Sequence, residues 1–579
     1  MLDWFSGVFG RRRKSPPDTN KADTAKLVAA NALLKSGKLE AAEREVRTFL
    51  GDFPLNIAAQ SLLAGILSER DKHEEACALC ERILNDTPQD TNQLCATAQI
   101  HWRAGRYTRA LQFCDQALRL DPSYIQAWLV RANSFQSLGR QPEALQAFNR
   151  ILELNPDDRD FHSSVLFFLY RSDVLPAYEI RAAHERWATL HANTLTQLRS
   201  HWNNQPNPTR RLKIGYVSGD FRTHVVSFFI EPLLRAHDKT EFDVYCYSNG
   251  KMSDATTERL LALAGHWRDI HLLDDESVAK LIRDDCIDIL VDLSGHTFGN
   301  RLLVFARKPA PLQVTWLGYI GTTGLKAMDY IIGDPNADLP GKADADFSEK
   351  ILRLPVSRWC FTAPRDAPAV TPLPASRSGT LVFGSFTNFS RLNDDIFSIW
   401  SKILAALPSS KLKLIGVTPG ESLDRMLEIF ELAGVTASRL ELHARLGYAQ
   451  CLEQMGNCDI ALDSYPLNGG TTTFEALWMG VPVISRAGEF RAARSSLSIL
   501  GAIGLGNLCS RSPEEYISIA IDLAQDQIRL SELRMGLRDQ MRASPLMDAA
   551  KFTSDLERAY RSIWREYCAT RSSAHAAWS

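Results

Sequence analysis

The sequence lacks the features of membrane, nucleic-acid-binding and disulfide-stabilised proteins. None of its apolar runs reaches the ~18–20 residues that span a bilayer. Its 66 Lys and Arg are balanced by 68 Asp and Glu, so it has no excess positive charge for binding nucleic acid. Its eleven cysteines are scattered, and the close pair Cys77 and Cys80 lies within a predicted helix. We therefore expect a protein of the reducing cytoplasm with no metal, nucleic acid or transmembrane segment.

The first residues, MLDWFSGVFGRRRK, place apolar residues before a basic cluster. A secretory signal has the opposite order, so we expect no export. Residues 1–21 are predicted to form a flexible tail. Its apolar side chains, among them Trp4 and Phe9, are available for a weak contact with a membrane or a partner.

Residues 22–160 contain four copies of a 34-residue repeat. Three sets of positions share this period: Pro54, Pro88, Pro122 and Pro156; Gly37, Asp71, Gly105 and Gly139; and Ala42, Ala76, Ala110 and Ala144. The period is that of tetratricopeptide repeats, helix pairs that stack into an α-solenoid. Asp71 occupies a glycine position, where aspartate also tolerates a turn. Such a solenoid binds extended peptides, so this region predicts a protein partner and says nothing about chemistry.

Residues 161–205 are predicted to be a helical linker, after which short apolar strands alternate with helical stretches. This alternation predicts two Rossmann-like halves with parallel sheets, at 206–370 and 371–579, the second ending in a closing C-terminal helix. The expected fold class is α + α/β. Neither half contains GxGxxG or GxxxxGK[ST], which disfavours a dinucleotide oxidoreductase and a P-loop NTPase.

The segment SYPLNGGTTTFEALWMG, residues 464–480, joins a predicted strand to a predicted helix. One interpretation is a tight glycine turn followed by a threonine N-cap. The other is an anion site, because the N–H groups at a helix start bind phosphate and glycines allow its approach. The segment alone does not decide between them.

The order of modules and several longer motifs resemble those of the O-GlcNAc transferase/SPINDLY family of tetratricopeptide-repeat protein glycosyltransferases. The resemblance is to a bacterial-type member of that family. The motifs are IGYVSGDFRTHVVSFFI, the stretch from 288 to 334 with ARKPAPLQVTWLGYIGTTG, FGSFTNFSRLNDDIF, GGTTTFEALWMGVPV and GEFRAARSSLSILGAIGL. The similarity extends from about residue 22 to residue 560.

The resemblance implies a metal-independent, inverting GT-B enzyme without a cofactor. It would transfer a sugar from a nucleotide sugar to Ser or Thr of a protein recruited by the repeats. It implies His224, Arg391 and Asp285 as catalytic residues. The donor would contact Gly470, Thr471, Thr472, Thr473, Glu475, Tyr448 and Arg494, and the acceptor side would be formed by His296, Thr297, Thr322 and Thr323.

Three positions depart from the family's pattern for UDP-GlcNAc donors. Arg391 replaces a lysine, Tyr448 belongs to an altered base-reading segment, and Gly470 replaces a histidine. The resemblance to the SPINDLY branch and to bacterial relatives implies two alternative donors, GDP-fucose and a CMP-nonulosonic acid, the latter with flagellin as acceptor. An alternative of another class is a catalytically silent repeat scaffold.

Overall fold

The computed structural model describes residues 21–171, 175–198 and 202–576. The chain forms two compact units, residues 1–156 with 418–428 and residues 157–417 with 429–579. The predicted N-terminal tail lies outside the described residues except for Lys21. None of the helices described is long and apolar enough to cross a bilayer.

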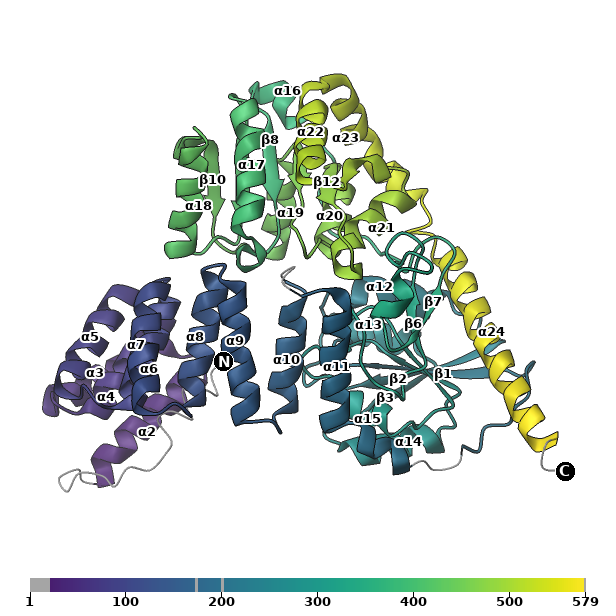
Figure 1. The fold of residues 1–579 in the computed structure, drawn as a ribbon, viewed down its shortest axis with the longest axis horizontal. Helices are drawn as coiled ribbons and strands as arrows, with labels where there is room; N and C mark the ends of the chain where they lie inside the picture. Colours follow the sequence, from purple (N-terminus) through teal and green to yellow (C-terminus); the bar gives the residue numbers. More distant parts are fainter. Residues whose placement is uncertain (1–20, 172–174, 199–201, 577–579) are drawn as a thin grey trace. The chain divides into compact units, whose positions relative to one another are not determined.

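Among its described residues, the repeat region of the first unit contains eight helices in four antiparallel pairs, which confirms the predicted tetratricopeptide solenoid (Figure 1). Gly37, Asp71, Gly105 and Gly139 all have φ between 60° and 75° and form the turn within each pair. The four repeated alanines are fully buried where the helices approach each other. The pairs are α2 (Lys21–Lys35) with α3 (Leu39–Asp52), α4 (Ile57–Glu69) with α5 (His73–Asp86), α6 (Thr91–Arg103) with α7 (Tyr107–Leu120), and α8 (Ile125–Ser137) with α9 (Gln141–Leu154).

The second unit begins with α10 (Arg159–Leu169), α11 (Ala177–His191) and η1 (Asn193–Leu198), and continues into two parallel sheets. The first sheet has the order β3-β2-β1-β4-β5-β6-β7. Its strands are β1 (Leu212–Ser218), β2 (Phe242–Ser248), β3 (His266–Asp269), β4 (Ile289–Asp292), β5 (Leu312–Thr315), β6 (Tyr330–Gly333) and β7 (Lys350–Arg353). Its helices are α12 (Ser227–Ala236), α13 (Ala255–Leu263), α14 (Asp275–Asp284) and α15 (Leu302–Ala306), followed by η2 (Ala343–Asp346).

The second sheet has the order β10-β9-β8-β11-β12-β13. Its strands are β8 (Val382–Ser385), β9 (Lys411–Ile415), β10 (Leu440–His443), β11 (Ile460–Leu462), β12 (Val483–Arg486) and β13 (Cys509–Ser510). The helices of this half are α16 (Pro374–Ser378), α17 (Asp394–Ala406), α18 (Glu421–Leu432), α19 (Tyr448–Gly456), α20 (Thr471–Trp478), α21 (Ser495–Ala502), α22 (Pro513–Gln525) and α23 (Gln527–Arg542). Short turns are η3 (Phe389–Arg391), η4 (Ala437–Arg439), η5 (Arg491–Arg494) and η6 (Gly506–Leu508).

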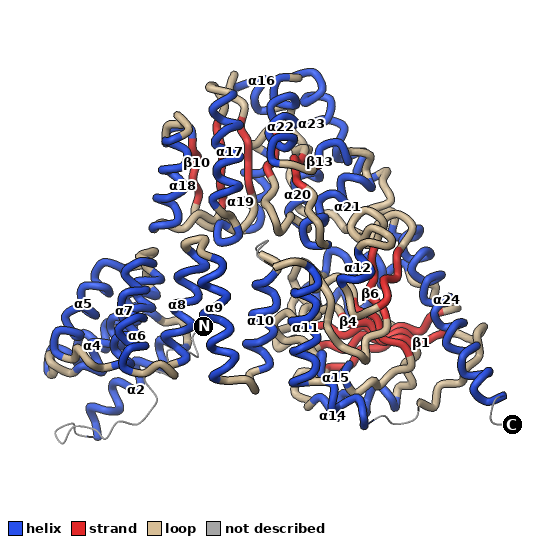
Figure 2. Tube along the Cα trace, in the orientation of Figure 1, coloured by secondary structure: helices blue, strands red, loops and turns tan. Residues whose placement is uncertain are grey.

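Both sheets are doubly wound, with helices on both faces (Figure 2). The direction of winding reverses between β1 and β4 in the first sheet and between β8 and β11 in the second. Ligands of open α/β sheets bind at the carboxyl ends of the strands at such a reversal. The fold therefore offers one such position in each half.

The C-terminal helix α24 (Ala549–Ala576) packs on the first sheet rather than closing the half that precedes it in sequence (Figure 1). Its Phe552, Leu556, Tyr560 and Trp564 share one apolar core with β1 and β4. The segment from 371 onward thus supplies the second sheet and then returns to the first.

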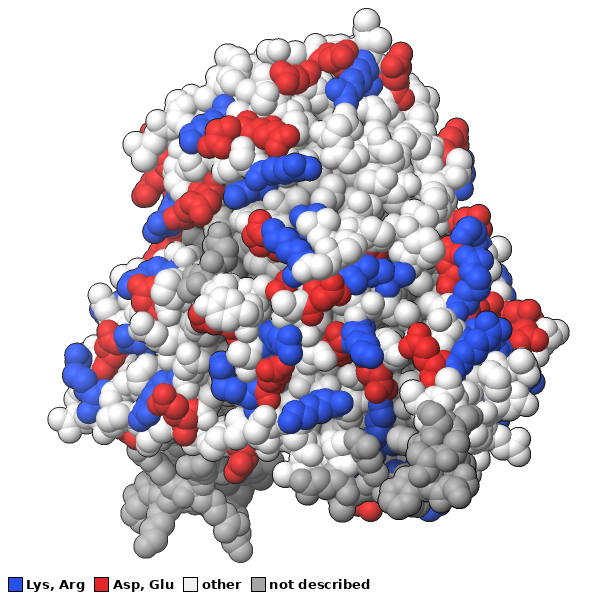
Figure 3. Space-filling model, turned by 45° about the vertical axis from the view of Figure 1, so that its right-hand side comes forward, with Lys and Arg blue, Asp and Glu red and all other residues white. Residues whose placement is uncertain are grey.

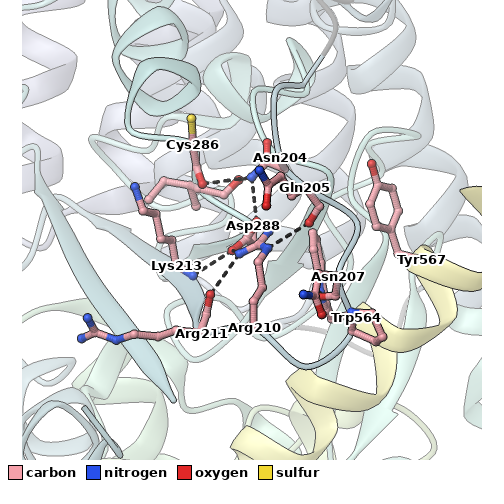
Figure 4. A network of polar contacts seen from close by, with 12 residues as sticks. Asn204, Gln205, Asn207, Arg210, Arg211, Lys213, Cys286, Asp288, Trp564 and Tyr567 are labelled. Carbon is pink, nitrogen blue, oxygen red and sulfur yellow. Dashed lines mark hydrogen bonds and ion pairs between the residues drawn. The ribbon is translucent and has the colours of Figure 1, made fainter. Parts of the chain in front are cut away.

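A buried carboxylate ties the end of the helical linker to the amino edge of the first sheet (Figure 4). Asp288 is fully buried and accepts hydrogen bonds from Asn204 Nδ2 (2.7 Å), Arg210 Nη1 (2.7 Å) and the N–H of Lys213 (2.8 Å). The Arg210 guanidinium also lies 4.8 Å above the ring of Trp564 in α24. Asp288 and Arg210 thereby join the linker, the first sheet and the C-terminal helix. They lie at the amino edge of the sheet, opposite to the carboxyl edge where a ligand is expected to bind.

Candidate functional site

A pocket of about 280 Å³ lies at the carboxyl edges of both sheets. Loops after β1 and β4 form one side, and the start of α20, which follows β11, forms another. It is thus located at the winding reversals of both sheets, as expected for a ligand site in this fold. The lining residues are Asp220, Arg222, His224, Val225, Val226, Phe229, Thr297, Phe298, Leu317, Gly318, Trp359, Gly470 and Thr471.

His224 lines the pocket from the turn that leads into α12, with about a third of its side chain (33%) exposed. Its Nδ1 accepts a hydrogen bond from the N–H of Val226 (3.4 Å) and lies 3.6 Å from Asp220 Oδ2. Nε2 has no partner among the described residues, so this nitrogen is available to a ligand. Burial lowers the pKa of His224, which favours the neutral imidazole that can accept a proton at pH 7.

Asp285, predicted to be catalytic, lies at the opposite edge of the first sheet. It ends α14 and precedes β4, whose four residues span roughly 13 Å before the pocket begins. Its carboxylate accepts hydrogen bonds from Arg268 Nη2 (2.9 Å) and Tyr247 Oη (2.9 Å). The structure therefore corrects this assignment, because the carboxylate that reaches the pocket beside His224 is Asp220.

The start of α20 leaves backbone donors facing the pocket. Gly470 is the N-cap and supplies no side-chain cap, so the threonine N-cap interpretation of this segment is wrong. A Cβ added at Gly470 would lie 3.9 Å from the Trp359 ring and within 4 Å of no other neighbouring atom, so the space beside this glycine is open. Gly469 is required by packing, since a Cβ there would lie 2.6 Å from Thr473 Oγ1 and 2.9 Å from Thr472 Oγ1.

Buried Asp463 holds this turn in place. Its Oδ1 accepts from the N–H groups of Ser464 (2.9 Å) and Gly469 (2.8 Å), and its Oδ2 accepts from Ser485 Oγ and Ser496 Oγ (2.6 Å each). Ser496 Oγ lies 3.0 Å from Thr473 Oγ1. The hydroxyl of Thr473 therefore belongs to this network, whereas Thr471 lines the pocket; Thr472 and Thr473 both line a smaller hollow beside Thr387.

Glu475 and Tyr448, both predicted donor contacts, are bonded to each other. Tyr448 Oη donates to Glu475 Oε1 at 2.7 Å, and about half of the Tyr448 residue is exposed. Burial raises the pKa of Glu475 to about 7. The Glu475 carboxyl group therefore changes its charge near neutral pH. Glu475 lies one helical turn after Thr471, which lines the pocket.

Of the four predicted acceptor-side residues, only Thr297 lines the pocket. His296 is buried and bonded to Ser163 Oγ (3.1 Å) and to the carbonyl of Thr323 (2.9 Å). Thr322 and Thr323 are fully buried, and both hydroxyls donate to buried Glu349. These three side chains hold loops together and are not available to line the cleft.

The two predicted arginines lie outside the pocket lining. Arg494 uses its guanidinium on the carbonyls of Asn336 (3.0 Å) and Gly488 (3.1 Å), which makes it a link between loops. Arg391, in η3 after β8, is partly buried and has no side-chain partner among the described residues. It lies at the winding reversal of the second sheet.

Several pocket residues were not predicted from the sequence. Asp220 and Arg222 belong to the same GDFRTH phrase as His224, and their position directly after a strand was the signal for them. Phe298 is 95% exposed at the pocket. Trp359 lines the pocket with its Nε1–H buried and without an acceptor among the residues described. No local pattern marks these two aromatic residues.

Charged side chains do not gather by sign on the face shown in Figure 3, where acidic and basic residues are interspersed. This distribution agrees with the net charge of −2. The metal-free character predicted from the sequence is not tested by the structure and stays a prediction.

Comparison with known proteins gives matches over both units. Residues 161–361 and 373–556 match the sequence profile of Glycosyl transferase family 41. Residues 27–91 match the Tetratricopeptide repeat profile, and residues 69–151 match that of Anaphase-promoting complex, cyclosome, subunit 3.

Individual relatives agree with these profiles. The chain is 40% identical over 428 residues to the probable UDP-N-acetylglucosamine–peptide N-acetylglucosaminyltransferase SPINDLY of Solanum lycopersicum, covering 72% of this chain and 45% of that protein. It is 30% identical over 382 residues to the probable enzyme SEC of Arabidopsis thaliana, covering 63% of this chain and 38% of that one. The chain thus spans less than half the length of these curated relatives.

A solved structure of a mutant O-GlcNAc transferase from Thermobaculum terrenum is similar along nearly its whole length. The TM-score is 0.74 and the identity 38%, covering 89% of this chain and 98% of that chain. Because the family profile covers more than half of the chain and a solved relative is covered almost completely, this chain belongs to glycosyl transferase family 41.

Proposed function

We propose that this chain is an inverting protein O-glycosyltransferase, which transfers a sugar from a nucleotide sugar to Ser or Thr of a protein held by the repeats. The observation that carries the proposal is the pocket at the winding reversals of both sheets. There His224 from the first half faces Gly470 and Thr471 from the second. The names of the relatives, which specify a nucleotide sugar and a peptide, support it.

The reaction breaks the bond between the anomeric carbon and a phosphate oxygen, and forms one to the acceptor hydroxyl oxygen. Negative charge grows on the departing phosphate, and the N–H groups at the start of α20 are suited to stabilise it. The acceptor hydroxyl must also lose its proton. Neutral His224 can accept that proton on Nε2, directly or through water, in the tautomer whose Nδ1–H points to Asp220 Oδ2, 3.6 Å away, instead of accepting from the N–H of Val226.

The relatives' names and three residues of this chain indicate different donors. The relatives' names specify UDP-N-acetylglucosamine, whereas Arg391, Tyr448 and Gly470 depart from the pattern for that donor. GDP-fucose and CMP-nonulosonic acids are the alternatives. Flagellin as acceptor has no support in these relatives' names and stays a prediction, as does the cytoplasmic location.

A thermal-shift panel of UDP-, GDP- and CMP-sugars identifies the donor, because a ligand of the native state raises the melting temperature. Release of nucleotide from that donor, with and without a protein acceptor, then separates an enzyme from a silent scaffold. We expect His224→Ala to lower release at least ~100-fold, the lower range for loss of a general base, with nucleotide binding retained.

The matched control is His271→Ala, because His271 bonds Asp269 (2.8 Å) and does not line the pocket. It should release nucleotide as the wild type does. Wild-type release from His224→Ala would remove this residue from the mechanism. A donor that binds but is never cleaved would favour the scaffold.

A further inference from the structure

Arg171 and Arg391 are two cationic side chains of the second unit that have no anionic partner in the part of the chain that the structure describes. Arg171 Nε is shielded from solvent and has no hydrogen-bond partner among the residues described. Its guanidinium contacts the Phe167 ring, with Cζ 5.6 Å from the centroid. Arg391 likewise forms no side-chain hydrogen bond or ion pair within the described residues. Burying a cation without a counter-charge is costly, so such groups normally have a partner.

The two guanidiniums also repel each other electrostatically. Burial and repulsion by Arg391 lower the pKa of Arg171 to about 10, and burial lowers that of Arg391. Two neighbouring cations that repel each other raise the free energy of the ligand-free protein. An anion between them would remove both the repulsion and the lack of partners.

Each arginine belongs to a segment that is connected with the pocket or with a hollow beside it. Phe167, one helical turn before Arg171, packs 6.1 Å from the ring of Tyr319, whose neighbour Gly318 lines the pocket. On the other side, Arg391 follows Thr387, which shares a hollow with Thr472 at the start of α20. Arg171 thus follows α10 of the linker, which packs on the first half, and Arg391 belongs to the second half.

We propose that Arg171 and Arg391 together bind the anionic part of the donor, which makes Arg171 a second cation of the donor site. This inference rests on the proposed function. The ligand chemistry is a pair of adjacent negative charges, because two guanidiniums and the start of α20 supply more positive charge than a single phosphodiester carries. Two sources provide it: the diphosphate of a UDP- or GDP-sugar, or the phosphate and carboxylate of a CMP-linked acidic sugar.

The test uses Arg171→Gln and Arg391→Gln in the full chain, with Arg181→Gln as matched control, because Arg181 is paired with Glu185 on neighbouring α11 (2.8 Å). Calorimetry should show about 10- to 100-fold weaker donor binding for each of the first two variants, the range for one charge-assisted contact. The double variant should lose less than the product of the single effects, because both cations hold one group.

Ligand-free melting temperature separates this role from a structural one. A ligand-binding cation without a protein partner should be replaceable by glutamine with an unchanged or higher melting temperature. A lower melting temperature with unchanged donor affinity would overturn the proposal, and so would unchanged affinity alone.

Two comparisons identify the source of the charge. If the diphosphate is bound, Arg171→Gln should also weaken binding of UDP or GDP without a sugar. If the carboxylate is bound, Arg171→Gln should weaken the binding of CMP-N-acetylneuraminate but not the binding of CMP. Should the wild type bind no nucleotide, the proposed function fails. Inorganic pyrophosphate then decides the arginine pair, since it should raise the melting temperature of the wild type and not that of Arg171→Gln.

Discussion

Replacing Asp463 should weaken nucleotide binding although this residue lies behind the pocket. Its carboxylate accepts two backbone N–H groups and two serine hydroxyls at 2.6–2.9 Å, and only 5% of the residue is exposed. Through these bonds it fixes the turn that presents Gly470 and the first N–H groups of α20. Loosening this turn should misplace the donors that are proposed to meet the phosphate.

The structure gives different magnitudes for two substitutions. Asp463→Ala leaves two buried N–H groups without an acceptor, at about 1–3 kcal/mol each. In Asp463→Asn the amide oxygen still accepts hydrogen bonds from both N–H groups. The amide NH₂ donates to the two serine hydroxyls, which can rotate to accept. The free energy of unfolding then falls by about 1–2 kcal/mol, mainly because the charge that strengthened these hydrogen bonds is gone. At about 2–4 °C per kcal/mol for a lobe of this size, the melting temperature should fall by roughly 2–8 °C for asparagine and clearly more for alanine.

The matched control is Asp459→Asn at the other end of the same strand. Asp459 is fully buried and accepts from the N–H groups of Ala375 (2.9 Å) and Val382 (2.8 Å), far from the pocket loops. It should lower the melting temperature and leave the nucleotide Kd unchanged in calorimetry, whereas Asp463→Asn should raise Kd. Equal Kd values for wild type and Asp463→Asn, or an equal loss in both variants, would refute the reasoning.

Three further predictions follow from the site and its titratable groups. Asp220→Asn should lower nucleotide release about tenfold or more, whereas Asp285→Asn should only lower the melting temperature; the reverse result would return Asp285 to the site. Burial raises the pKa of Glu475 to about 7, so its contribution to folding stability is full below pH 4.5 and lost as the pH rises through 7. Nucleotide affinity should rise over pH 6–8 as the carboxylate forms, and Glu475→Gln should abolish that dependence in calorimetry. Burial lowers the pKa of His162 and His184 to about 4, so their stabilising contribution is full above pH 6.5 and lost as the pH falls through 4; the melting temperature should fall over this range, less steeply in His184→Gln.

Features that depend on neighbouring residues could be predicted from the sequence. The 34-residue period places Asp71 at a turn, and the structure gives it φ 60°. Gly470 and Thr471 follow a predicted strand and line the pocket, as does His224. In parallel sheets the loop after a strand reaches the ligand edge, so position in the chain was informative there.

Features that depend on distant residues could not be predicted. The hydroxyls of Thr322 and Thr323 are taken by Glu349, 26 or more residues later, and no local pattern announces that partner. The destination of α24 on the first sheet is likewise set by packing. Asp285 is a different case, because its place before a strand rather than after one already indicated the wrong edge.

The pocket loops are held by buried acids, and the unpaired basic groups are left for the ligand. Asp292 accepts from the N–H groups of Ser294 (3.0 Å) and Gly295 (2.9 Å) in the loop after β4, and Asp463 does the same after β11. These loops therefore have internal partners before any ligand binds, which reduces the ordering cost of binding. Arg171 and Arg391 have no such partners within residues 21–171, 175–198 and 202–576. Substituting the acids should therefore lower stability and affinity together, whereas substituting the arginines should lower affinity alone, and this contrast distinguishes a preformed pocket from one that the ligand assembles.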